Sequence, residues 1–95
     1  MRVAETIGKL TLNKWHPSLH GATWLLAVPL TLEGLAGQAA GRGEEFVVFD
    51  EFGAGIGSRI AVSEGAEAAA PFYPATKPID AYNAAILDNI EFELL

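Results

Sequence analysis

The chain has 95 residues, 51% of them hydrophobic, and its 12 acidic and 6 basic side chains give a formal charge of −6. A chain of this length builds one small core, so we expect residues 1–95 to form a single domain. The acidic balance and the dispersed lysines and arginines argue against nucleic-acid binding, which needs clustered positive charge. The hydrophobic fraction is high for so small a domain and predicts self-association that covers apolar surface.

The chain contains no cysteine, which excludes a disulfide framework and a thiolate metal site. Its first ten residues, MRVAETIGKL, lack the apolar core of a signal peptide. The longest apolar run, at 24–30, is far too short to cross a membrane and contains Pro29. We therefore expect a soluble, cytoplasmic protein that makes no membrane contact.

The first half of the chain predicts two strands. Residues 3–12 are typical of a strand. Its apolar side chains, expected to face inward, stand at odd positions before Gly8 (Val3 and Ile7) and at even positions after it (Leu10 and Leu12). A glycine at such a change predicts a bulge. After a polar loop at 13–21, residues 23–32 are typical of a buried strand, in which Pro29 favours an edge or a bulge.

The second half is less regular. The glycine-rich segment 33–45 predicts a mobile connection, and residues 45–50 and 59–63 predict two short strands. Residues 66–77, with two prolines, are expected to cross the surface with at most one helical turn. The segment 78–92 is ambiguous, because Asp80 is able to cap a helix while residues 86–92 also alternate as a strand. Several short strands with glycine turns favour a small sandwich or barrel.

The turn between the strands at 45–50 and 59–63 contains Gly53, Gly55 and Gly57 at alternate positions. Glycine permits positive φ or a close approach of another backbone, and the residues between the glycines are only Ala54 and Ile56. This composition indicates packing rather than chemistry.

Other candidate groups have simpler interpretations. His16 and His20 have the spacing of a helical metal site, but Pro17 argues against that helix, so we expect two solvated loop histidines. Asp50 and Glu51 are neighbours on a strand and point to opposite faces, which favours a solvated charge or a local turn hydrogen bond over an acid/base pair. No serine has a recognisable base partner. We therefore expect neither an enzyme nor a cofactor.

Four blocks give the chain a family resemblance. They are MRVAETIGKLTL, HPSLHGATWLLAVPL, VFDEFGAGIGSRIAVSEG and KPIDAYNAAILDNI, in that order. The third is the most specific, because it holds an aspartate, a Gly-Ala-Gly turn and two further glycines, here Asp50, Gly53 to Gly55, Gly57 and Gly65. In these blocks the chain resembles the pentameric vertex proteins of bacterial microcompartments, the shells of carboxysomes and of ethanolamine metabolism.

The resemblance implies a mainly β fold, a small five-stranded OB-like barrel with at most a short helix, which assembles as a cyclic pentamer. It implies a final strand at about 84–92, with Asp80 and Ala81 at the start of that element. The implied function is structural: a homopentamer in the cytoplasm closes shell vertices by docking against shell hexamers, and trimers where present. The candidate subunit interface is the turn Gly53, Ala54, Gly55, Ile56, Gly57 and Ser58.

Two departures from the family pattern concern single residues. Ser58 stands where the family often has an acidic residue, and the segment after Gly65 lacks the family's arginine. Trp15 lies on a loop, where it is either folded back onto the core or waiting for a partner, and with His16 it is the candidate contact to a shell partner. The alternative function is an OB-like binding module for a small ligand or single-stranded nucleic acid, which would use Trp15, Trp24 and Tyr73.

Overall fold

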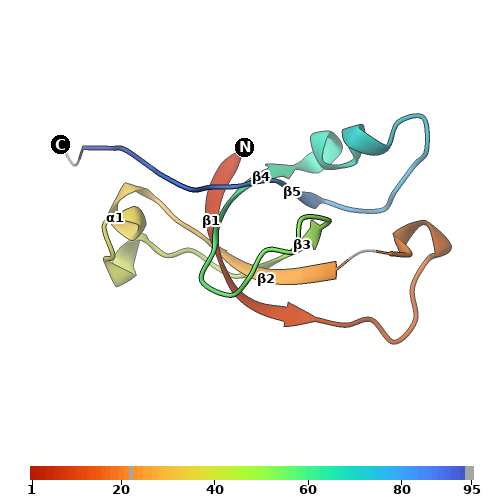
Figure 1. The fold of residues 1–95 in the computed structure, drawn as a ribbon, viewed down its shortest axis with the longest axis horizontal. Helices are drawn as coiled ribbons and strands as arrows, with labels where there is room; N and C mark the ends of the chain where they lie inside the picture. Colours follow the sequence, from red (N-terminus) through yellow and green to blue (C-terminus); the bar gives the residue numbers. More distant parts are fainter. Residues whose placement is uncertain (22, 94–95) are drawn as a thin grey trace.

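The computed structural model describes residues 1–21 and 23–93, which form a closed barrel of five strands (Figure 1). The strands are β1 (Arg2–Leu10), β2 (Thr23–Pro29), β3 (Phe46–Asp50), β4 (Arg59–Glu64) and β5 (Ala81–Ile86). Their order around the barrel is β1-β2-β3-β5-β4, and β4 pairs with β1 to close it. Only the contact of β3 with β5 is parallel. The predicted mainly β, five-stranded barrel is confirmed.

Strand β1 carries the predicted bulge, since its register against β2 shifts between Thr6 and Gly8. The predicted inward face was wrong, however. Ala4 and Thr6 are fully buried, whereas Ile7 is exposed on the outer surface. Side chains alternate between the two faces of a strand, so Ile7 points out of the barrel because Ala4 and Thr6 point into it.

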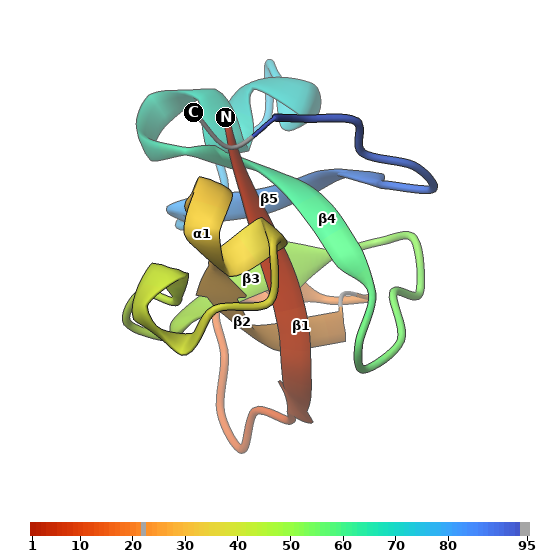
Figure 2. The same ribbon diagram turned by 90° about the vertical axis from the view of Figure 1, so that its left-hand side faces the viewer.

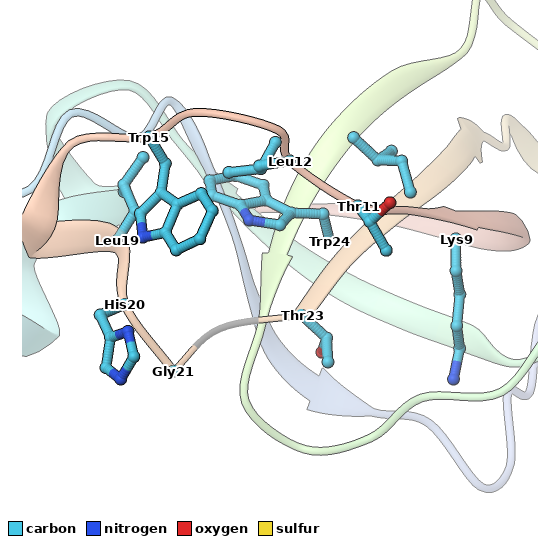
Figure 3. A pocket seen from close by; sticks show the side chains of 10 residues that line it. Lys9, Thr11, Leu12, Trp15, Leu19, His20, Gly21, Thr23 and Trp24 are labelled. Carbon is cyan, nitrogen blue, oxygen red and sulfur yellow. The ribbon is translucent and has the colours of Figure 1, made fainter.

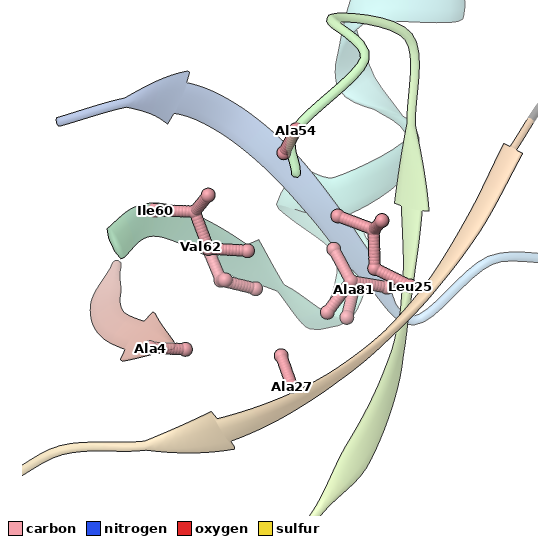
Figure 4. Packing of buried hydrophobic residues seen from close by; sticks show 8 residues of the cluster. Ala4, Leu25, Ala27, Ala54, Ile60, Val62 and Ala81 are labelled. Carbon is pink, nitrogen blue, oxygen red and sulfur yellow. The ribbon is translucent and has the colours of Figure 1, made fainter. Parts of the chain in front are cut away.

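The barrel interior is filled mainly by small and branched side chains (Figure 4). Its members are Ala4, Leu25, Ala27, Val48, Ala54, Ile60, Val62 and Ala81. Ala54 belongs to the glycine turn rather than to a strand, and Figure 4 shows its methyl group directed into the barrel. The turn is therefore anchored to the core by one side chain.

A second cluster lies on the other side of β3 and β5, where the 3-10 helix η3 (Gly65–Phe72) covers the sheet. Phe49 is its centre, with ring centroids 5.2 Å from Trp24, 5.5 Å from Phe72 and 6.2 Å from Tyr82. Edge-to-face and offset pairs of this kind add to the stability gained by burial. Within the segment predicted at 66–77, the helix runs as far as Phe72 and is longer than the single turn expected.

The connection after β2, predicted to be mobile, contains two short helices. It contains α1 (Leu32–Leu35) and the 3-10 helix η2 (Ala39–Gly41), which pack together through Gly34 and Gly41. A Cβ on Gly41 would lie 1.9 Å from the Gly34 nitrogen, so this approach requires glycine. Pro29 ends β2 beside these helices. It does not lie at an edge, since the closed barrel has none.

The last strand is shorter and earlier than the predicted 84–92, and the helical alternative is also wrong. Ala81 begins β5, as expected, but the strand ends at Ile86. Its partner β4 begins at Arg59, whose carbonyl oxygen accepts a hydrogen bond from the Leu87 N–H at 2.8 Å. Beyond that bond β4 offers no residue to pair with, so β5 cannot continue.

Candidate functional site

The glycine turn is built around the carboxylate of Asp50, which is buried at the end of β3. The carboxylate accepts hydrogen bonds from the backbone N–H groups of Phe52, Gly53 and Ala54, each at 3.0 Å. A short acidic side chain readily accepts from the backbone just after it, which makes the turn rigid. The predicted local turn bond is confirmed, and the alternative of a solvated charge is wrong.

A fourth hydrogen bond to Asp50 comes from β5, where the buried amide of Asn83 donates to Oδ1 at 2.9 Å. The amide oxygen of Asn83 accepts in turn from the Ala85 N–H at 3.2 Å, so its orientation is fixed. Sequence reasoning missed Asn83. The signal was a polar residue between the apolar positions of a strand, where burial requires a partner.

The surroundings of Asp50 also determine its protonation. Burial by itself raises the pKa of Asp50, but the amide of Asn83 and the N–H groups of Phe52, Ala54 and Gly53 outweigh that effect and hold the pKa below its usual value. Its neighbour Glu51 is exposed and accepts from the Tyr82 hydroxyl at 3.0 Å. The two carboxylates therefore point to different environments, as predicted.

The three glycines of the turn are needed for different reasons. Gly53 and Gly57 have φ of +74° and +90°, a conformation that side chains rarely adopt. Gly55 has no such constraint, and a Cβ there would find its nearest neighbour, the Ser58 Oγ, 3.9 Å away. Within one chain, Gly55 therefore has room for a side chain.

The end of the turn is fixed to β1. The Gly57 N–H donates to the Thr6 carbonyl at 2.7 Å, and the Thr6 N–H donates to the Ser58 carbonyl at 2.9 Å. Between these anchored ends Ile56 is 70% exposed, and Phe52 is 53% exposed on the same turn. Ala54 is the exception among the predicted interface residues, because its side chain is buried in its own barrel. A rigid turn with two exposed apolar side chains is suited to contact another surface.

The other predicted contact, Trp15, lines a pocket of about 360 Å³ between the end of β1 and the loop at 11–21 (Figure 3). Trp24, on β2, lines the same pocket, while Tyr73 lies in a different hollow beside η3. The indole of Trp15 is half exposed, so it is partly folded back and partly open. The three aromatics of the alternative binding module are thus not brought together.

His16 begins the 3-10 helix η1 (Pro17–Leu19), where its Nδ1 accepts from the Ser18 N–H at 3.1 Å. His16 and His20 are both exposed, as expected for loop histidines. Among the described residues, no group of three or more His, Cys, Asp or Glu side chains is placed to hold a metal ion. None of the described helices is long and apolar enough to span a membrane.

The long loop at 11–21 is held against the second cluster by Lys77. Its ammonium donates to the Ser18 carbonyl and lies 4.7 Å from the ring centroid of Phe72 and 5.7 Å from that of Phe49. A cation over aromatic faces gains electrostatic stabilisation when it is partly removed from water. Lys77 thus connects the pocket-bearing loop to the segment after β4.

Several solved structures share the fold and part of the sequence of this chain. The GrpN pentameric microcompartment shell protein from Rhodospirillum rubrum has 31% identity and a TM-score of 0.80 over 98% of this chain and 100% of that one. CcmL from Nostoc sp. PCC 7120 has 28% identity and a TM-score of 0.79 over 95% of this chain and 92% of that one. CcmL from Gloeobacter violaceus has 25% identity and a TM-score of 0.79 over 98% of this chain and 91% of that one.

No curated protein matches the sequence. The family described as "Ethanolamine utilisation protein EutN/carboxysome" matches residues 1–88, which include all five strands and the glycine turn. The resemblance inferred from the four sequence blocks is thereby confirmed, and the chain belongs to the EutN/carboxysome family of microcompartment proteins.

Proposed function

We propose that this chain is a structural shell protein, five copies of which form a closed ring at a vertex of a bacterial microcompartment. The observation that carries the proposal is the match to the family over residues 1–88, together with a pentameric shell protein 31% identical over nearly the whole chain. In this role the chain acts by shape and burial, and no bond is made or broken. Its location is the shell of a compartment in the cytoplasm.

The proposed seam between neighbouring copies is the glycine turn. Ile56 and Phe52 supply exposed apolar area, while the Asp50 hydrogen bonds keep the turn from collapsing onto its own barrel. Gly55 is open in the single chain, so its lack of a side chain leaves room for a neighbour. Gly53, Gly57 and Ser58 shape the turn. Ala54 supports the seam from inside the barrel.

The ring is proposed to dock against shell hexamers, and trimers where present, and so to complete the closed shell. The loop that carries Trp15 and His16 is the proposed contact to a shell partner, because both side chains are exposed there. Net negative charge on the ring favours solubility and tunes this docking.

Vertex capping is tested by co-expression with shell hexamers and electron microscopy of the purified particles. With this chain present, closed particles are expected to carry density at their fivefold corners. Without it, the corners are expected to be open. Closed particles that never incorporate the chain would contradict the proposal.

The seam is tested with Gly55→Leu, a substitution that one chain tolerates but a close neighbour does not. We expect the variant to keep the circular dichroism spectrum of the folded barrel. Its mass in solution is expected to fall below that of five copies. Leu32→Ala, which shortens an exposed side chain on α1, is the control and is expected to keep that mass. An unchanged five-copy mass for Gly55→Leu would place the seam elsewhere.

A further inference from the structure

The pocket beneath Trp15 has the lining of a binding site for an apolar group. Its volume of about 360 Å³ lies in the range of ligand sites, and its walls include Leu10, Leu12, Leu19 and both tryptophans of the chain. Figure 3 shows the indoles of Trp15 and Trp24 next to each other among the side chains that line the pocket. Lys9 and His20 also line the pocket, whose described lining contains no acidic residue.

One basic side chain of this acidic protein, Lys9, lines the pocket without an ion pair to any described residue. Four of the six basic side chains are engaged elsewhere: Arg2 with Glu64, Arg42 with Glu5, Arg59 with the Leu35 carbonyl and Lys77 with the Ser18 carbonyl. The other two are Lys9 and Lys14, which make no ion pair with any described residue. Lys9 lines the pocket and Lys14 adjoins Trp15, so the site suits an apolar group flanked by carboxylates.

A segment of that chemistry follows β5. Residues 88–93, the acidic tail, read DNIEFE, in which Ile90 and Phe92 alternate with Glu91 and Glu93. The acidic tail lies beyond the last strand pairing, and Phe92 is 39% exposed. It therefore carries an aromatic side chain between two carboxylates, outside the strand pairings of its own barrel.

The acidic tail lies away from the pocket of its own chain (Figure 1). Figures 1 and 2 show it beside α1, at the end of the molecule opposite the loop at 11–21. The molecule is 45 Å long. A molecule with the acidic tail at one end and the pocket at the other is able to form a head-to-tail contact with the next copy. Such a contact closes into a ring when it is repeated with the right rotation.

We propose that the acidic tail of one copy inserts Phe92 into the Trp15 pocket of the next copy, with Glu91 and Glu93 against Lys9 and Lys14. This contact rests on the proposed ring, and it assigns the pocket side of Trp15 to a second copy of the chain rather than to a shell hexamer.

The absence of native cysteine allows a direct test with engineered disulfides in the full chain. In Thr11→Cys/Glu91→Cys, one thiol lies at the pocket and the other on the acidic tail. Mild oxidation is expected to give a ladder of covalent oligomers up to the closed ring. Thr11→Cys/Glu44→Cys is the matched control, which places the second thiol on an exposed residue outside the tail and is expected to stay uncrosslinked.

The native mass of the same double variant before oxidation separates the two proposals. An assembled ring that crosslinks no faster than the control would overturn the tail contact and leave the proposed ring intact. A monomer that fails to crosslink would overturn both. A disulfide within one chain would also overturn the tail contact.

Fluorescence gives a second readout, because the only two tryptophans line the pocket. Phe92→Ala in the full chain is expected to shift emission to longer wavelength, whereas Tyr73→Ala, at an exposed position outside the pocket, is expected to leave it unchanged. Lys9→Glu is expected to lower the crosslinking rate of the Thr11→Cys/Glu91→Cys pair several-fold, and Glu93→Lys to restore it. Unchanged emission in Phe92→Ala, or a rate insensitive to both charges, would contradict the contact.

Discussion

The side-chain amide of Asn83 on β5 donates to the carboxylate of Asp50 at the end of β3 over 2.9 Å. The same carboxylate accepts from three consecutive backbone N–H groups of the glycine turn. One buried anion therefore joins two neighbouring strands to the segment proposed as the seam between subunits. The geometry of that segment depends on a charge that is not itself on the surface.

Replacement of the Asp50 carboxylate is expected to lower the free energy of unfolding. Asp50→Asn turns one acceptor into a donor that faces the N–H groups of the turn, so buried donors lose their partner. We expect the free energy of unfolding to fall by about 2–4 kcal/mol. Urea unfolding at one fixed chain concentration measures it. Asp88→Asn, at an exposed position, is the control, and equal midpoints for the two variants would contradict the role of Asp50.

The depressed pKa of Asp50 predicts how stability changes with acidity. A carboxyl group with a lower pKa in the folded state stabilises the fold above its unfolded pKa of about 4, and that contribution is lost as pH falls through the folded value. The wild-type chain should therefore lose more stability than Asp50→Asn between about pH 5 and pH 2. Unfolding midpoints of both proteins across that interval measure the difference. Parallel curves would show that the pKa of Asp50 is unshifted.

The glycines of the turn should respond differently to one added methyl group. Gly57→Ala forces a side chain to adopt φ of +90° and is expected to cost about 1–2 kcal/mol of folding stability. Gly55→Ala meets no atom closer than 3.9 Å in its own chain. It should leave the unfolding of the separated chain nearly unchanged. Thermal unfolding at dilution below the assembly threshold compares the two, and an equal loss in both would contradict this distinction.

Replacement of Thr6 is expected to raise the folding stability rather than lower it. Its side chain is fully buried, and its hydroxyl has no hydrogen-bond partner among the described residues. Thr6→Val keeps the shape and removes a polar group whose burial carries a desolvation cost, so we expect stability to rise by about 1 kcal/mol or more. The backbone bonds of Thr6 to Gly57 and Ser58 are unaffected by this change. A loss of stability in Thr6→Val would contradict this prediction.

The sequence predicted local features better than pairings. Gly8 marked the bulge of β1, and Asp80 with Ala81 marked the start of β5. The end of β5 was wrong because it is determined by Arg59 on β4, a residue distant in sequence. The packing of Gly34 on Gly41 was missed for a related reason, since the glycine content that indicated mobility in fact permits a close contact.

In the candidate site, too, local features were predicted from the sequence and contacts between distant segments were not. The turn and its glycines were evident from the spacing of Gly53 and Gly57, whereas the local turn bond of Asp50 was only one of two predicted alternatives. Burial of Ala54 could not be predicted, because it depends on which side of the closed barrel the turn crosses. Trp24 and Trp15 share a pocket only because the loop between them folds back.

The central claim, a ring of five copies, is tested most directly by the native mass of the purified wild-type chain in solution. Light scattering coupled to gel filtration, or native mass spectrometry, gives that mass without reference to any partner. The account predicts one species of about five times the 10.1 kDa chain mass, stable over a tenfold dilution. A stable 10.1 kDa monomer, or a closed assembly of another number of copies, would contradict it.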